Sequence, residues 1–174
     1  VLETVPGLVA TQHSGSGKAN QFFLRGFNLD HGTDFATHVD GMPVNMRSHG
    51  HGQGYTDLNF LIPELVGSIE FTKGPYDAAS GDFAGAGSAH INVASRPVDT
   101  RLSFGGGNFG FRRALFTGSA DAAGGTFIYG VEQQDYAGAW DSIDEDVDRK
   151  NLWLKQSWGT PKSGFDIIFM GYDN

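Results

Sequence analysis

Apolar and polar residues alternate along several stretches of the second half of the chain, as they do in strands with one buried face. Phe127, Tyr129 and Val131 share one face, and Ile128 interrupts the polar face between them. Clusters of Gly, Asp, Asn, Pro and Ser separate five such stretches, at residues 100–104, 111–117, 126–132, 151–158 and 165–170. The pattern predicts an antiparallel β-meander whose connections are tight, except for a long acidic one at residues 137–148.

The first half is more mixed and predicts an α+β unit. Short strands are expected at residues 22–24, 36–39 and 68–72. A helix is expected at residues 57–66, capped by Thr56 or Asp57, with Pro63 tolerated only near its start or as a break. Glycines punctuate the long loops between these elements. Loops of that length inside a compact unit are usually functional.

A shift in composition divides the chain near Arg96-Pro97. All 6 histidines precede this point and all 3 tryptophans follow it. We therefore expect two structural units, at residues 1–98 and 99–174.

Charge and cysteine content narrow the function classes. The 174 residues carry a net charge of −8, with 12 Lys and Arg against 20 Asp and Glu. This balance offers no cationic surface to a phosphate backbone, so no nucleic acid partner is expected. With no cysteine, the chain has neither disulfides nor thiolate metal ligands. No transmembrane helix is expected, but barrel strands of about ten residues escape a hydropathy search.

The strand pattern alone leaves two architectures open. One is a soluble β-sandwich, and the other is part of a transmembrane barrel with short turns on one side and longer loops on the other. About five strands cannot close a barrel in lipid, because the open edges would leave backbone groups without partners. If the second unit belongs to a barrel, the chain is expected to be a fragment.

Six short motifs together resemble the plug domain of TonB-dependent outer-membrane receptors. They are, in order, Val5-Pro6-Gly7, Leu24-Arg25-Gly26-Phe27, Val39-Asp40-Gly41-Met42-Pro43-Val44, Leu61-Ile62-Pro63-Glu64, Ile69-Glu70-Phe71-Thr72-Lys73-Gly74-Pro75 and Ile91-Asn92-Val93. Their order and spacing carry the resemblance, which covers nearly all of residues 1–98. Lys73 stands where the family usually has Arg, and residues 76–83 replace its usual Ser-x-x-Tyr-Gly, so the chain resembles a divergent branch.

The resemblance implies an α+β plug, a small mixed sheet with short helices, followed by an antiparallel β-meander that belongs to a transmembrane barrel of about 22 strands. It also implies residence in the outer membrane of a Gram-negative bacterium, in contact with its lipid. The implied activity is uptake of a scarce ligand, energised by TonB and its inner-membrane complex, with no cofactor required. A ferric siderophore or another metal chelate is favoured because siderophores are the commonest cargo of the family.

A plug inside a polar barrel is best held by contacts that can be released. Arg25 suits this role, since its planar fork can pair with a barrel carboxylate in two places, whereas Lys73 offers a single hydrated charge and a looser contact. With Glu70, these residues form the expected latch between plug and barrel. An ordinary ion pair at a strand end is the other interpretation.

The most distinctive motif is Arg47-Ser48-His49-Gly50-His51-Gly52-Gln53-Gly54-Tyr55. Two imidazoles two residues apart on an extended backbone point to the same side, and the glycines allow both to turn toward one zinc, copper or nickel ion. His31, His38, Asp34 or Asp40 would complete such a site. The other interpretations are contact with an organic ligand and structural packing. The expected ligand-binding set is His31, Asp34, Arg47, His49, His51, Gln53 and Tyr55.

Two other motifs do not support enzymatic chemistry. Residues 105–110 have the G-x-G-x-x-G spacing of a dinucleotide site, but a strand is expected to follow instead of the required helix, which indicates a hairpin turn. Ser16-Gly17-Lys18 lacks the first glycine and the final Ser or Thr of a P-loop. We therefore expect no enzyme. The alternative function is a soluble, β-rich module that binds metal or glycan.

Overall fold

The computed structural model describes residues 1–12, 15–140, 142–160 and 162–174. The chain forms two compact units. The first contains Val1–Asn59 and Val66–Val93, and the second contains Phe60–Leu65 and Ala94–Asn174. In the described part of the chain, no helix has the length and apolar character needed to cross a membrane.

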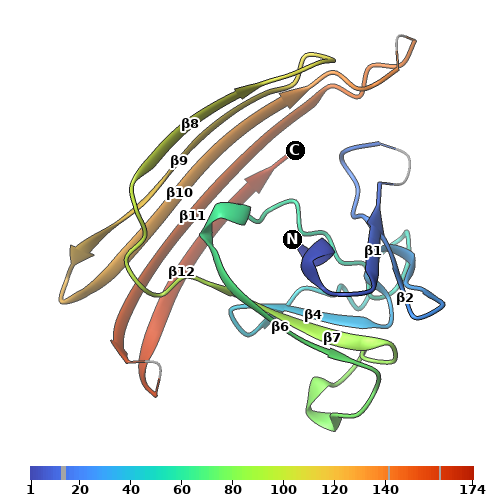
Figure 1. Cartoon of the computed structure of the whole chain (residues 1–174), viewed down its shortest axis with the longest axis horizontal. Coiled ribbons are helices and arrows are strands. Elements are labelled where there is room, and N and C mark those ends of the chain that lie inside the picture. Colours follow the sequence, from blue (N-terminus) through green and yellow to red (C-terminus); the bar gives the residue numbers. More distant parts are fainter. Residues whose placement is uncertain (13–14, 141, 161) are drawn as a thin grey trace. The chain divides into compact units, whose positions relative to one another are not determined.

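The first unit contains two small sheets (Figure 1). Strands β1 (Leu8–Thr11), β2 (Gln21–Leu24) and β3 (Phe27–Asn28) form an antiparallel sheet. The second sheet has the order β5-β4-β7-β6, from β4 (Phe35–Val39), β5 (Met42–Pro43), β6 (Val66–Lys73) and β7 (Gly87–Val93). Strands β4 and β7 run parallel, and the other neighbours are antiparallel. The three short strands expected from sequence, at residues 22–24, 36–39 and 68–72, are therefore present.

Short 3-10 turns complete the fold, at η1 (Leu2–Thr4), η2 (Asp30–Gly32), η3 (Pro63–Leu65) and η4 (Ala78–Ser80). The expected helix at residues 57–66 is wrong, because only η3 forms within it. Pro63 lacks an N–H and disfavours helical geometry at the residue before it. The Asp57 carboxylate accepts a hydrogen bond from the Asn59 N–H at 2.8 Å, which closes a local turn instead of capping a helix.

The second unit contains a five-stranded antiparallel meander, in the order β12-β11-β10-β9-β8 (Figure 1). Its strands are β8 (Arg101–Gly106), β9 (Arg112–Ala122), β10 (Gly125–Tyr136), β11 (Val147–Thr160) and β12 (Ser163–Asp173). The alternation in the sequence predicted all five. Strand β11 starts earlier than expected, so Asp148 lies in the strand and the acidic connection covers residues 137–146, of which 141 is outside the described residues.

The hairpin turns follow the local chemistry of the sequence. Ala123 and Gly124, with φ of 50° and 75°, form the two-residue turn between β9 and β10. At residues 105–110, the Gly107 N–H donates to the Phe111 carbonyl and β9 follows directly. This motif is a hairpin turn, as the sequence predicted.

The two faces of the meander differ sharply in polarity. In the strand register, one face carries the exposed large apolar residues Leu102, Phe104, Phe116, Val131, Phe165, Ile167 and Phe169. The opposite face buries the polar side chains of Glu132, Asn151 and Lys155. A sheet of a water-soluble protein would normally cover such an apolar face, so this arrangement is typical of strands that face lipid.

Segment Phe60–Leu65 packs on the polar face of the meander, within the second unit. Gly130 makes room for it: the Cδ1 atoms of Leu65 and Ile62 lie 2.7 and 2.9 Å from the position that a Cβ on Gly130 would take. Ile128, two residues along the same face, is fully buried. The apolar residue that interrupts the alternation therefore belongs to a patch of the face that is covered by protein.

Arg113 fixes the same segment by charge. Its Nη1 and Nη2 donate to the two carboxylate oxygens of Glu64 at 2.6 and 2.9 Å, and its Nε donates to Glu132 at 2.5 Å. The Asn151 amide donates to the other Glu132 oxygen at 2.7 Å. The hydrogen bonds from Arg113 lower the pKa of Glu64. This cluster was not predicted from sequence.

Replacement of Arg113 by Ala is expected to release segment Phe60–Leu65. The two charge-assisted hydrogen bonds from Arg113 to Glu64, which hold the segment to the strand, are lost, and together they contribute about 3 kcal/mol. The amide of Leu65, which donates to the Ile62 carbonyl, should then exchange its hydrogen about a hundredfold faster. Hydrogen exchange of the detergent-solubilised protein measures this. The neighbouring, exposed Arg112→Ala is the control, and equal protection in the two variants would contradict the assignment.

The pair of Glu64 and Arg113 also predicts a dependence on pH. Since the folded pKa of Glu64 lies below its ordinary value of 4.5, the stabilisation is complete above that pH and is lost as the pH falls through the folded value. The stability difference between the parent and Glu64→Gln, measured by thermal unfolding, should therefore shrink on acidification. A difference that stays constant from neutral pH to about pH 3 would show that the charge of Glu64 plays no part.

Candidate functional site

The loop that carries the Gly-His motif is closed at its base. The Met46 N–H donates to the Tyr55 carbonyl at 2.9 Å, and the Gly54 N–H donates to the Met46 carbonyl at 2.7 Å. The intervening side chains of Arg47, His49 and His51 are exposed, whereas Tyr55 is buried. The sequence therefore forms a loop with a fixed base and an accessible tip.

His31 occupies the turn η2 on the other side of this site. It is fully buried and has a φ of 61°, in the left-handed region that non-glycine residues rarely adopt. Its Nδ1 lies 2.6 Å from the Ala19 carbonyl oxygen. Because a carbonyl only accepts, Nδ1 carries the proton, and in the neutral ring Nε2 carries the lone pair. The His31 carbonyl in turn accepts from the Thr56 N–H at 2.8 Å.

Four rings meet between this turn and the loop. His49 stacks on Tyr55 with ring centroids 4.1 Å apart, and His51 meets His31 edge-on at 4.4 Å. The Tyr55 hydroxyl accepts from the Ala19 N–H at 2.9 Å, beside the carbonyl that holds His31. Four of the residues predicted to bind ligand are thus brought together.

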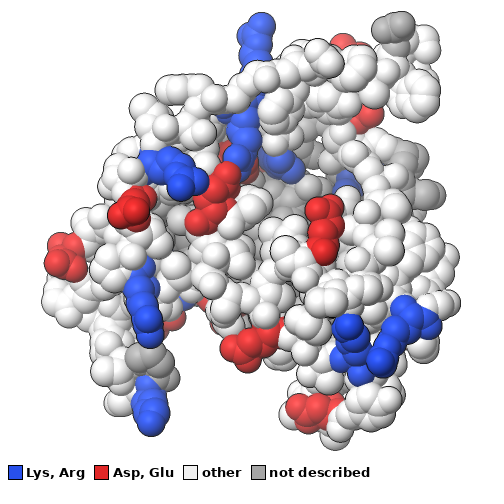
Figure 2. All heavy atoms as spheres, viewed as in Figure 1, with Lys and Arg blue, Asp and Glu red and all other residues white. Residues whose placement is uncertain are grey.

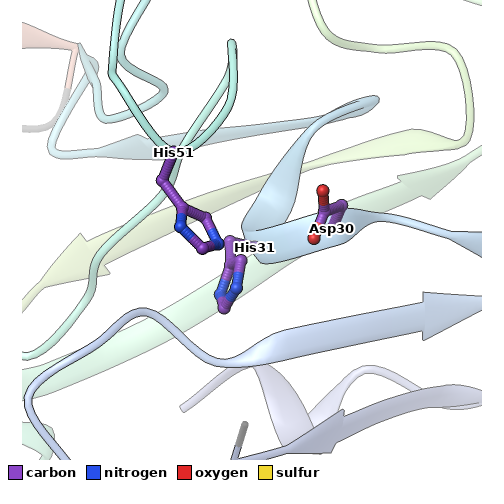
Figure 3. Close-up of side chains that lie close together, drawn as sticks. All are labelled: Asp30, His31 and His51. Carbon is purple, nitrogen blue, oxygen red and sulfur yellow. The ribbon is translucent and has the colours of Figure 1, made fainter. Parts of the chain in front are cut away.

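Asp30, His31 and His51 bring three metal-ligand side chains together, since one ligand atom from each lies within 4.8 Å of the other two (Figure 3). The sequence interpretation instead paired His49 with His51 as the two histidine ligands of the metal ion. In the structure, the His49 Nδ1 accepts the His51 N–H at 3.1 Å, so this nitrogen serves the loop itself. Asp30 was missed because its proximity depends on the turn at η2.

The other residues considered as completing ligands lie elsewhere. His38 stacks on His90 at 4.6 Å, and burial, followed by the charge of His90, lowers the pKa of His38. The Asp40 carboxylate accepts from the Val93 N–H at 2.8 Å. Asp34 lies beside Gly85.

Two more predicted ligand residues lie in the exposed part of the loop. The Arg47 Nη2 lies 3.8 Å from the Asp82 Oδ2, and both side chains are largely exposed. Gln53 is exposed as well. An exposed pair at this distance stabilises little and leaves the Arg47 charge accessible to a ligand.

The residues of the expected latch occupy separate places in the first unit. Arg25 is exposed in the turn between β2 and β3, with a φ of 52°. Lys73 lies over the ring of Phe71, with Nζ 5.6 Å from its centroid, and Glu70 accepts a hydrogen bond from Asn92 at 3.4 Å. Their role toward a barrel stays a prediction.

Asn45 is the residue that sequence reasoning missed most clearly. Its amide nitrogen donates to the carbonyls of Gly32, Phe35 and Gly54 at 3.0–3.1 Å, and its oxygen accepts from the Thr37 N–H at 2.7 Å. One side chain therefore ties the η2 turn, strand β4 and the base of the Gly-His loop. An asparagine in a loop gives no sign of such a role in the sequence.

Known proteins resemble the chain in sequence and in fold. Residues 1–88 match the family described as the TonB-dependent receptor plug domain. This match covers half of the chain, and the chain belongs to this family. The family places it in the outer membrane of a Gram-negative bacterium.

Two solved structures share the fold. One is the copper transporter OprC, at 19% identity and a TM-score of 0.66, with 91% of this chain covered. The other is the siderophore receptor PirA from Acinetobacter baumannii, at 18% identity and a TM-score of 0.62, with 98% covered. The chain spans 25% and 30% of the length of those two proteins.

Replacement of Asn45 by Asp is expected to loosen the Gly-His loop. The change removes an amide donor and turns a carboxylate oxygen toward three carbonyls, which costs about 3 kcal/mol. Trypsin cleavage after Arg47 should then be at least about tenfold faster, because cleavage follows local opening. The same chemical change at the exposed Asn20 is the control. Equal cleavage rates in the two variants would refute a role for Asn45 in holding the loop.

Proposed function

We propose that the chain is the plug and the first barrel strands of a receptor that actively takes up a scarce ligand across the outer membrane. Membership of the plug family carries this proposal. The exposed apolar face of the meander supports it, because lipid is the partner that such a face requires.

The rings and charges around the Gly-His loop support a binding role for it. The exposed rings of His49 and His51 supply stacking surfaces and nitrogen atoms, the buried rings of Tyr55 and His31 contact them, and Arg47 supplies an accessible positive charge. Such a surface suits a ferric siderophore or another metal chelate, since these ligands combine aromatic or anionic groups with a metal ion. The names of the two similar structures, a copper transporter and a siderophore receptor, agree with this ligand class.

TonB, with its inner-membrane complex, is the proposed source of energy. A plug segment must be released without unfolding the sheet beneath it, and polar contacts allow this better than a continuous apolar core. The fork between Glu64 and Arg113 is a contact of this kind. We assign no bond chemistry to the protein.

The soluble module that binds metal or glycan is the weaker interpretation. It leaves seven large apolar side chains on one face of the meander without a partner. The surface drawn in Figure 2 is mostly uncharged, with acidic and basic side chains interspersed in small groups. The exposed apolar side chains make the meander better suited to lipid than to a polar macromolecule.

Uptake in whole cells tests the proposed function. Cells that produce the protein should accumulate radioactive iron supplied on catecholate or hydroxamate siderophores, or radioactive copper, and a tonB deletion should abolish the accumulation. Tyr55→Ala removes the ring on which His49 stacks and should lower uptake at least about tenfold, whereas the exposed Tyr76→Ala should not. Accumulation of every probe at the level of cells without the protein would refute the proposal.

A further inference from the structure

We propose that Asp30, His31 and His51 bind one divalent transition-metal ion. The inference names the ligand class of the receptor site and in that respect rests on the proposed function. It differs from the sequence interpretation in its residues: His49 is not a ligand, His31 is the completing histidine, and Asp30 is added.

His31 is the fixed ligand of this site. The hydrogen bond from Nδ1 to the Ala19 carbonyl, at 2.6 Å, sets the tautomer and the ring orientation. Metal-binding histidines commonly use one nitrogen in this way, which leaves Nε2 as the donor to the ion. Full burial of the ring and the hydrogen bond from the Thr56 N–H to the His31 carbonyl hold this donor in place.

Asp30 and His51 are the adjustable ligands. Two ligand atoms that share one ion at about 2.1 Å lie at most about 4.2 Å apart, so a separation of up to 4.8 Å needs only a small inward rotation. Both side chains are exposed to solvent, which leaves room for this rotation. His51 also lies between Gly50 and Gly52, around which there is open space, so the loop can follow its side chain.

The donor set selects the kind of ion. Two imidazole nitrogens and one carboxylate oxygen suit copper(II), nickel(II) or zinc, with copper bound most tightly, whereas calcium and magnesium require mainly oxygen ligands. Three protein ligands leave a coordination position open, as in zinc sites that hold water or substrate. An ion held here is therefore able to accept a further ligand from solution.

Titration calorimetry with copper, nickel and zinc chloride tests the site in the detergent-solubilised protein. We expect one ion per chain and affinity weaker by at least about tenfold in His51→Ala and Asp30→Asn, both at exposed positions. His90→Ala, at an exposed histidine that stacks on His38 outside the site, is the matched control and should retain the parent affinity. With copper, electron paramagnetic resonance should show coupling to imidazole nitrogen, reduced in His51→Ala.

The outcomes separate this inference from the proposed function. Equal affinity of the parent and His51→Ala, or a loss in His90→Ala as large as that in His51→Ala, would overturn the site. Siderophore-dependent uptake with no metal binding would overturn the site and leave the proposed function standing. Metal binding that depends on Asp30 and His51, without uptake of any probe, would support the site and count against the proposed function.

Discussion

The candidate site depends on how loop backbone groups are satisfied without a sheet or helix to pair them. A buried carbonyl or N–H without a hydrogen-bond partner costs free energy. A loop therefore keeps one conformation only where other groups replace the backbone hydrogen bonds of a sheet or helix. The Asn45 side chain does this for three carbonyls at once. It thereby sets the distance between the η2 turn and the base of the Gly-His loop, and His31 and His51 meet because that distance is fixed.

The same hydrogen bonds sustain an unfavourable backbone. A left-handed conformation at a residue such as His31 costs on the order of 1–3 kcal/mol and persists only where the surroundings impose it. Two hydrogen bonds impose it here. The His31 ring donates to the Ala19 carbonyl, and the His31 carbonyl accepts from the Thr56 N–H. Gly32 is equally constrained, because a Cβ there would lie 2.5 Å from the Cβ of Thr56. Strain and its compensation lie at the residues that form the site, as in many functional sites.

The sequence predicted what depends on local periodicity and missed what depends on long-range contacts. Alternation predicted the five strands of the meander, but the helix at residues 57–66 was wrong because Pro63 and the Asp57 turn prevail over the pattern. His51 was singled out as a ligand from its neighbours in sequence, and its role stays a prediction. The neighbours of His51 in space could not be predicted in this way. The prediction assumed an extended backbone, whereas the loop folds so that the His51 N–H donates to the His49 Nδ1.

Arg113 shows how one side chain can hold a segment and still allow its release. Its Nη atoms bind Glu64, whereas Nε binds Glu132, so the two carboxylates use different donors. If segment Phe60–Leu65 leaves, the buried Glu132 carboxylate keeps its hydrogen bonds from the Arg113 Nε and the Asn151 amide. The negative charge of Glu132 therefore stays paired. A lysine would offer one ammonium to both carboxylates, so that release of Glu64 would also disturb the contact with Glu132. The geometry of arginine therefore separates the stability of the strands from the attachment of the segment.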